Sequence, residues 1–182
     1  RLCSAGNMIY IQHYNSYVGG ITISSDGNAL TGLWFDGQKY YAGNIDDEIE
    51  EKDVPVFAQA RQWLDIYFSR HDPGFTPALT LDSTPFRMAV WRILLTIPFG
   101  KTMTYGEIAA RIAELKGIRR MSAQAVGSAV GHNPISLIIP CHRVVGADGS
   151  MTGYAGGIDR KIKLLEMERS ACVWTVPHLF RE

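Results

Sequence analysis

The chain has 182 residues, of which 46% are apolar and 20% are charged, and its formal net charge is zero. This composition predicts a soluble, globular protein of one domain or two small ones. The cysteines Cys3, Cys141 and Cys172 are too few and too widely spaced for a disulfide framework or a paired-cysteine zinc site. We therefore expect a reducing compartment and no bound metal or other cofactor.

The charge is unevenly distributed along the chain. Residues 1–82 hold 5 Lys/Arg and 11 Asp/Glu, a net charge of −6, whereas residues 83–169 hold 12 and 6, a net charge of +6. A basic half suits a polyanion such as nucleic acid, although most surface charges are merely solvated. Nothing at the N-terminus has the form of a signal peptide, and the apolar tail 171–180 is shorter than the roughly 20 residues that span a bilayer. We expect no membrane partner.

The first half predicts a β-meander followed by one helix. Strands are expected over residues 8–14, 17–24 and 29–35, with a turn at 25–28. The acidic run 46–53 is predicted to be a solvated loop. Asp53 is predicted to cap a helix that starts near Pro55, and its apolar stripe is interpreted as core: Phe57, Ala60, Leu64, Tyr67 and Phe68. An extended connector over 75–81 suggests domains of residues 1–82 and 83–182.

The second half predicts short helices with short connections. Ser83 or Thr84 caps a helix from Pro85, and Thr104 and Glu107 form a capping box for the next. A basic connector, 117–120, leads to a helix of small residues over 123–131, capped by Ser122. Two short helices across a basic turn are typical of a helix-turn-helix. The small side chains suit close approach to a neighbouring helix or to DNA. A further helix is expected over 160–169, capped by Asp159.

The segment 139–145, with the sequence Ile-Pro-Cys-His-Arg-Val-Val, carries the strongest chemical signal. It follows an apolar run, 137–139, that predicts a short buried strand. Thiolate is the reactive form of cysteine, and cationic neighbours such as His142 and Arg143 lower a thiol pKa. A lone cysteine is more often an inert buried thiol. The glycine-rich stretch 152–157 predicts a flexible turn that would wall a pocket.

This segment resembles the active-site signature of the O6-alkylguanine-DNA alkyltransferases, which move an alkyl group from guanine onto their own cysteine. Further motifs match in the same order: Phe86 with Val90-Trp91, Ile97-Pro98 with Gly100, Tyr105-Gly106-Glu107-Ile108, Ala125-Val126-Gly127, Asn133-Pro134, and Tyr154 with Gly156-Gly157. The resemblance implies an α+β protein. An N-terminal ribonuclease-H-like β-sheet domain would precede an α-rich, winged helix-turn-helix domain that binds the minor groove of double-stranded DNA.

The resemblance also implies a single-turnover methyltransferase and gives roles to its residues. Cys141 would accept the alkyl group, His142 would take its proton through a bound water, and Glu168 would orient the histidine. Asn133 would hold the turn together, and Tyr105 would donate a proton towards guanine N3. The guanine pocket would comprise Val144 (through its backbone), Tyr154, Ala155, Gly156 and Gly157. The DNA-binding residues would be Thr104, Arg119, Arg120, Gln124, Ala125 and Gly127.

The substrate would be O6-alkylguanine, with O4-alkylthymine as an extension, because a base inside the stack has to be flipped out for chemistry. The partner would be duplex DNA carrying alkylated bases. We expect a monomer, in the cytoplasm near the nucleoid, or in the nucleus of a eukaryote.

The chain departs from the family at two positions. Gln124 stands where the family usually has an intercalating arginine, so flipping would be weaker unless Arg119 and Arg120 compensate. Ala155 replaces a common serine of the guanine-pocket loop.

Two other functions remain open at this stage. One is a helix-turn-helix DNA-binding or lesion-sensing protein without chemistry. The other is a cysteine hydrolase, which would turn over many times on an ester or amide.

Overall fold

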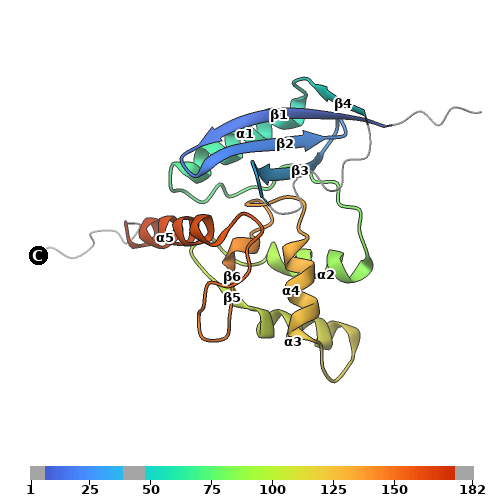
Figure 1. Ribbon diagram of the computed structural model, residues 1–182, viewed down its shortest axis with the longest axis vertical. Helices are drawn as coiled ribbons and strands as arrows, with labels where there is room; N and C mark the ends of the chain where they lie inside the picture. Colours follow the sequence, from blue (N-terminus) through green and yellow to red (C-terminus); the bar gives the residue numbers. More distant parts are fainter. Residues whose placement is uncertain (1–6, 39–47, 175–182) are drawn as a thin grey trace, which may run out of the picture.

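The N-terminal half builds a four-stranded sheet. The computed structural model describes residues 7–38 and 48–174. Its strands are β1 (Met8–Ser16), β2 (Gly19–Ser25), β3 (Leu30–Phe35) and β4 (Glu48–Glu51), in the spatial order β3-β2-β1-β4. The first three run antiparallel as a meander, and β4 pairs parallel to β1 (Figure 1). The predicted meander is confirmed.

The prediction of a loop over 46–53 is wrong for residues 48–51, because this stretch pairs with β1 as an edge strand. The register runs from Met8 opposite Glu48 to Ile11 opposite Glu51. All four side chains of β4 are exposed. An edge strand needs only backbone hydrogen bonds to its neighbour, so acidic side chains on both faces do not prevent pairing. Residues 46 and 47 lie outside the described residues.

Helix α1 (Pro55–Phe68) packs against β1, β2 and β3. Its predicted stripe is buried, apart from a half-buried Phe68. The predicted cap is wrong: the residue at the cap position is Val54, with no side-chain hydrogen bond. The Asp53 carboxylate instead forms an ion pair with Arg61 at 3.0 Å on the surface.

The C-terminal half contains α2 (Pro85–Leu94), α3 (Tyr105–Lys116), α4 (Ala123–Gly131) and α5 (Ile158–Trp174). Thr84 caps α2, Thr104 and Glu107 form the predicted capping box on α3, and Ser122 caps α4. Helix α5 starts at Ile158, so Asp159 lies in its first turn rather than at the cap. The strands β5 (Met103–Thr104) and β6 (Val144–Val145) form a small parallel sheet.

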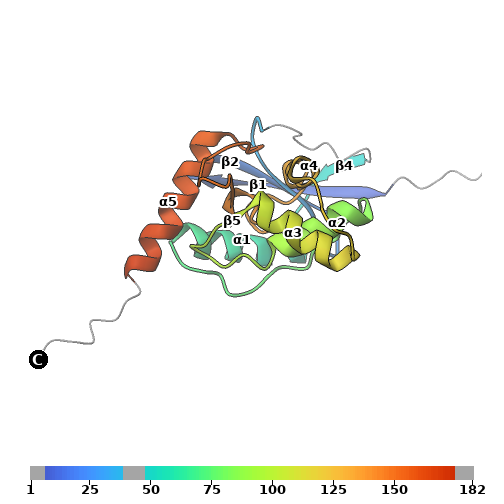
Figure 2. The ribbon, with the colours of Figure 1, turned by 90° about the horizontal axis from the view of Figure 1, so that it is seen from below.

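In both views of the molecule, α5 lies on one side and α2, α3 and α4 on the other (Figures 1 and 2). Helix α4 contacts α2 and α3, and the Trp91 indole N–H donates to the buried Ala129 carbonyl at 2.8 Å. The small residues of α4 therefore serve helix packing on one face. None of the helices in residues 7–38 and 48–174 has the length and apolarity that a membrane crossing requires.

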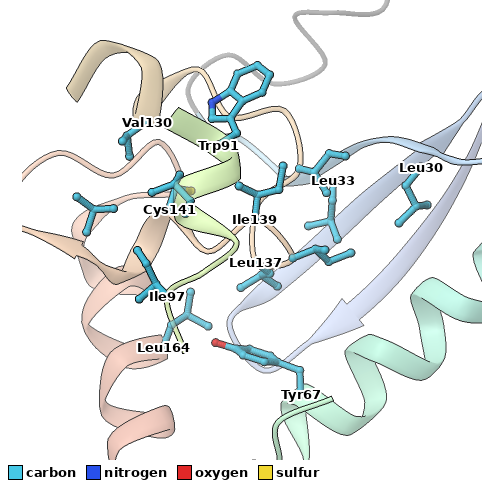
Figure 3. Packing of buried hydrophobic residues seen from close by; sticks show 14 of the residues in the cluster. Leu30, Leu33, Tyr67, Trp91, Ile97, Val130, Leu137, Ile139, Cys141 and Leu164 are labelled. Atoms are coloured by element: carbon cyan, nitrogen blue, oxygen red, sulfur yellow. The ribbon is translucent and has the colours of Figure 1, made fainter. Parts of the chain in front are cut away.

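One hydrophobic core runs through both halves, from the sheet and α1 to α2, α4 and α5 (Figure 3). The link passes through the chain after α4. The Leu33 N–H donates to the Pro134 carbonyl at 2.9 Å, and the Ser136 N–H donates back to the Leu33 carbonyl at 3.0 Å. This segment therefore lies along the edge of β3.

The predicted strand over 137–139 is wrong, because these residues form a buried turn. Leu137 has φ of 68°, in the left-handed region that strands do not use. The turn contains a backbone hydrogen bond of its own, since the Ile139 N–H donates to the Ile135 carbonyl at 3.1 Å. An apolar run in a turn is buried here because the core surrounds it on both sides.

Candidate active site

Cys141 begins η1 (Cys141–Arg143), a single turn of 3-10 helix between the buried turn and β6. Its N–H donates to the Ile139 carbonyl at 2.8 Å, and its side chain is buried, with 5% of the residue exposed. The thiol thus sits at the centre of the C-terminal half, among α2, α4 and α5 (Figure 3).

Asn133 braces the turn that leads to the cysteine. Its amide donates to the Ile139 carbonyl at 2.8 Å and the Ile135 carbonyl at 3.3 Å, and its Oδ1 accepts from the Ile135 N–H at 3.0 Å. These side-chain hydrogen bonds hold the backbone of the turn, in place of the hydrogen bonds that a neighbouring strand would supply. The structure therefore places Asn133 where the resemblance expects it, with its functional role still a prediction.

The Glu168 carboxylate, fully buried on α5, is the acceptor at the centre of the site. His142 Nε2 lies 2.7 Å from Oε1, and the Arg143 guanidinium donates to both oxygens at 3.0 to 3.2 Å. The Gly100 N–H reaches Oε2 at 3.2 Å, and the Tyr67 hydroxyl donates to Oε1 at 2.8 Å. A buried charge with this many donors is well compensated.

Protonation states in this cluster follow from burial and hydrogen bonding. Burial alone would raise the pKa of Glu168, but its electrostatic interaction and hydrogen bond with His142, followed by the hydrogen bonds and charge of Arg143, hold that pKa well below its ordinary value. Burial lowers the pKa of His142, against the pull of the Glu168 carboxylate. At neutral pH the carboxylate is charged and the imidazole is neutral. Nε2 must therefore carry the proton that Glu168 accepts, and Nδ1 keeps a lone pair.

That Nδ1 atom is buried and has no hydrogen-bond partner within the described part of the chain. A neutral imidazole with an available lone pair is a general base. The site thus contains a base, His142, that is held in one tautomer and follows Cys141 directly in the sequence.

The thiol is less acidic than the sequence suggested. Burial raises the pKa of Cys141 above its ordinary value, and the Asn133 amide and the Lys161 ammonium offset this only in part. The predicted lowering by His142 and Arg143 is wrong, because the first is neutral and the second is bound to Glu168. Cys141 rests as a thiol, so its reaction needs a base.

Lys161 is, after Arg143, a second buried cation near the thiol. None of its surface is exposed, and its ammonium donates to the Val144 carbonyl and to the Thr152 carbonyl, the latter at 3.0 Å. Burial lowers its pKa, and its interaction with Cys141 raises it. A cation in this place favours the thiolate over the thiol.

Tyr105 and Tyr154 connect the site to the glycine-rich loop. The Tyr105 hydroxyl donates to the Thr152 and Gly153 carbonyls at 3.1 and 3.3 Å, and burial raises its pKa, as does the proximity of Cys141. Tyr154 lies with its ring centroid 6.5 Å from that of His142. Burial also raises the pKa of Tyr154 well above its ordinary value, so both phenols remain protonated at neutral pH.

A cavity of about 310 Å³ lies between α4 and this loop. Its lining residues are Gly127, Ser128, Gly131, His132, Gly153, Tyr154 and Ala155. The predicted pocket residues Tyr154 and Ala155 thus face one cavity. Gly156 and Gly157 line a second cavity together with Val18, and the Val144 carbonyl accepts from Lys161. Their place in a guanine pocket remains a prediction.

The predicted DNA-binding residues lie at the start of α3, in α4 and in the connection between these two helices. Gln124 is exposed in the first turn of α4, Ala125 and Gly127 are half-buried, and the Thr104 hydroxyl caps α3. Arg119 and Arg120 are exposed and line a groove of about 750 Å³ between these helices. The start of α4, at Ser122 and Ala123, lines the same groove as the two arginines. The contacts of all the predicted residues with DNA stay a prediction.

Among residues 7–38 and 48–174, no group of three or more His, Cys, Asp and Glu side chains could hold a metal ion. Cys3 lies outside these residues, so the expected lack of a metal stays a prediction.

Sequence reasoning missed Tyr67 and Lys161 as parts of the site. Tyr67 read as one more apolar position of α1, and no sequence signal marks its hydroxyl. A signal for Lys161 existed, because positions 161, 164 and 168 share one helix face, and Leu164 is buried.

A buried cysteine next to a histidine that a buried carboxylate orients fits a group-transfer protein, and two short helices across a basic connector fit DNA binding. Comparisons with known proteins identify the family. Residues 9–82 match "6-O-methylguanine DNA methyltransferase, ribonuclease-like domain", and residues 85–170 match the DNA binding domain of the same family. The chain belongs to the methylated-DNA–protein-cysteine methyltransferase family.

Its relatives agree along most of the chain. The methyltransferase of Mycobacterium tuberculosis is 42% identical over 163 residues, which cover 90% of this chain and 94% of the relative. The Haemophilus influenzae relative is 40% identical over 162 residues, covering 88% and 87%. The crystal structure of M. tuberculosis OGT in complex with DNA has a TM-score of 0.76 at 40% identity, covering 90% of this chain and 94% of that one. The α+β architecture, with a ribonuclease-like sheet domain and a helical DNA-binding domain, is confirmed.

Proposed function

We propose that this protein repairs DNA by moving the alkyl group of O6-alkylguanine to the sulfur of Cys141. The observation that carries the proposal is the arrangement of Cys141, His142 and Glu168, in which a buried carboxylate holds a neutral imidazole as a base. The family membership supplies the substrate class. O4-alkylthymine, with a similar alkyl–oxygen bond, is a second substrate in this proposal.

The reaction is a displacement at the alkyl carbon. His142 Nδ1 takes the thiol proton through one water molecule, and the sulfur forms a bond to the carbon as the carbon–O6 bond breaks. The electron pair of that bond goes to guanine, which accepts a proton in exchange. The Tyr105 phenol moves from the loop carbonyls to donate its proton to guanine N3. Solvent then carries the thiol proton from His142 to the phenolate, so both side chains return to their starting states.

The product limits the protein to one reaction. A thioether has no carbonyl for water to attack, so the cysteine is not regenerated. One protein molecule would therefore repair one lesion.

DNA recognition in this proposal belongs to residues 83–182, with residues 1–82 as a separate domain. Gln124 would enter the space left by the flipped base, while Arg119 and Arg120 contact phosphates. The flipped base would occupy the cavity beside Tyr154 and Ala155, and Gly156, Gly157 and the Val144 backbone would complete its walls. We propose a monomer that binds damaged duplex DNA wherever the chromosome lies: the cytoplasm, or the nucleus of a eukaryote.

The test is intact-mass measurement and peptide mapping after mixing the protein with excess duplex that carries O6-methylguanine. We expect one methyl group on Cys141 and no further increase. Cys141→Ser should remain unmodified, while Cys172→Ser, at an exposed cysteine, should react as the wild type does. Binding to the lesion without any change in mass would refute transfer and favour a lesion sensor. Repeated turnover on an ester would favour a hydrolase.

A further inference from the structure

One side chain of the N-terminal half reaches the reactive cluster of the C-terminal half. Tyr67 extends from α1 with no exposed surface, and its hydroxyl points towards α5 (Figure 3). The hydroxyl donates to Glu168 Oε1 at 2.8 Å, and it lies 3.4 Å from His142 Nε2. It therefore shares with the imidazole the same oxygen atom of Glu168.

The direction of these hydrogen bonds is determined by the charges. Glu168 is an anion, so it accepts from both neighbours. Burial raises the pKa of Tyr67 well above its ordinary value, and the nearby carboxylate adds to this, so the phenol keeps its proton. Since Nε2 already donates to Glu168 at 2.7 Å, the phenol and the imidazole donate side by side to one oxygen, which also accepts from the Arg143 guanidinium at 3.0 and 3.2 Å.

The ring of Tyr67 is held rigidly. It stacks on Trp63 at a centroid distance of 5.1 Å and an interplanar angle of 10°. Phe68 and Phe99 contact it edge-on at 5.2 and 6.0 Å. A hydroxyl on a ring packed in this way is a fixed donor, and it costs little additional entropy to hold it against Glu168.

We propose that Tyr67 is a positioning residue for alkyl transfer, through which the N-terminal domain holds Glu168 so that His142 keeps its proton on Nε2 and its lone pair on Nδ1. This inference rests on the proposed function, since alkyl transfer gives the base its purpose. Arg143 binds both oxygens of the carboxylate, whereas Tyr67 binds only the oxygen that orients the imidazole.

A second effect follows from the shared oxygen. The Tyr67 hydrogen bond withdraws negative charge from Oε1, and that charge would otherwise stabilise a protonated imidazole. Without the hydroxyl, His142 would become easier to protonate. The groups that face His142 are Tyr67 from α1, Arg143 from η1, Tyr154 from the loop before α5, and Glu168 and Lys161 from α5, with Cys141 next to it in the chain. Of these, only Tyr67 changes in the test below.

The variant that isolates the hydroxyl is Tyr67→Phe, which keeps the packed ring. The structure offers a matched control in Tyr14→Phe. The Tyr14 hydroxyl also donates to a carboxylate, that of Asp65 at 2.6 Å, but on the surface of the N-terminal domain and away from Glu168. The two variants lose the same chemical group and the same type of bond.

Two measurements are made on the full-length protein and both variants. The first is the single-turnover rate of methyl transfer to Cys141 from duplex O6-methylguanine, measured across pH. The second is the ¹⁵N shift pattern of the His142 imidazole without DNA, which reports the tautomer. For Tyr67→Phe we expect a roughly tenfold lower rate at neutral pH, comparable to the loss of other supporting hydrogen bonds. The acidic limb of its profile should move to higher pH, while DNA affinity stays unchanged. Tyr14→Phe should match the wild type.

Several results would overturn the proposal. They are a Tyr67→Phe profile that coincides with that of the wild type, an equal loss in Tyr14→Phe, or a wild-type spectrum in which Nδ1 carries the proton. The nitrogen spectrum is measured on the wild type. The proposal can therefore still be refuted if Tyr67→Phe fails to fold. If the wild type transfers no methyl group, the proposed function fails, and the nitrogen shifts alone decide the role of Tyr67.

Discussion

Replacing Asn133 by alanine tests whether one side chain closes the turn before the reactive cysteine. The amide makes three hydrogen bonds there, two to the carbonyls of Ile135 and Ile139 and one from the Ile135 N–H. In the variant the two carbonyls keep a backbone partner each, from the N–H groups of Ile139 and Cys141. The Ile135 N–H loses its acceptor.

The cost can be worked out from these partners. One buried donor left unsatisfied costs about 1–3 kcal/mol, and each carbonyl that loses its second partner adds about 0.5 kcal/mol. The sum is roughly 2–4 kcal/mol, which is a large part of the stability of an ordinary domain. For a chain of this size that corresponds to a drop in Tm of about 4–16 °C.

The assay is urea unfolding followed by fluorescence, with Asn28→Ala as the control because Asn28 is exposed. We expect the control to change the free energy of unfolding by less than about 0.5 kcal/mol. The slope of the unfolding free energy against urea should stay constant in both variants. An Asn133→Ala protein as stable as the control would refute the claim that the amide holds the turn.

Three further predictions follow from the site and its surroundings. The pKa of Glu168 is depressed in the folded state, so its contribution to stability is complete above its unfolded pKa of about 4.3 and is lost as pH falls towards the folded value. The free energy of unfolding, measured from pH 6 to pH 2, should fall by up to about 1.4 kcal/mol per pH unit for this proton. A free energy that stays constant over this range would count against the buried anion. Gln124→Arg should tighten binding to duplex DNA and add about one unit to the salt dependence, whereas Gln62→Arg, on the exposed face of α1, should not; equal binding of the two in a salt titration would contradict the placement of Gln124. Gly156→Ala would bring a Cβ within 2.7 Å of the Tyr154 ring, so thermal unfolding should show a free energy of unfolding lower by about 1–3 kcal/mol. An unchanged Tm would show that the ring moves freely.

Local signals predicted much of the fold. The starts of α2, α3 and α4 each depend on a cap of Thr or Ser with its own hydrogen bond, which is encoded within four residues. The meander was predictable for the same reason, from β-branched residues bounded by a glycine turn. Where the fold depends on distant partners, the prediction failed. Strand β4 exists because β1 offers an edge, and residues 137–139 form a turn because Asn133 closes them.

The site divides in the same way. Cys141, His142 and Glu168 could be assigned through the family resemblance, and the structure brings Glu168 within hydrogen-bond distance of His142. The state of the thiol could not be predicted from its neighbours, because burial outweighs the nearby charges. Tyr67 could not be found at all, since its partner lies 101 residues away in the chain. A contact between residues so far apart produces no periodic pattern in the sequence from which it could be predicted.

The pairing of Leu33 with the chain after α4 has a consequence for solubility. A sheet with a bare edge strand invites association with another copy. Here the edge at β4 is protected by its exposed acidic side chains. The opposite edge, at β3, is occupied in part by the segment that leads to Cys141, through the bridge between Leu33 and Ile135. Any change that loosened this segment would therefore expose an unpaired strand and a nucleophilic thiol together, and the first sign of damage would be aggregation.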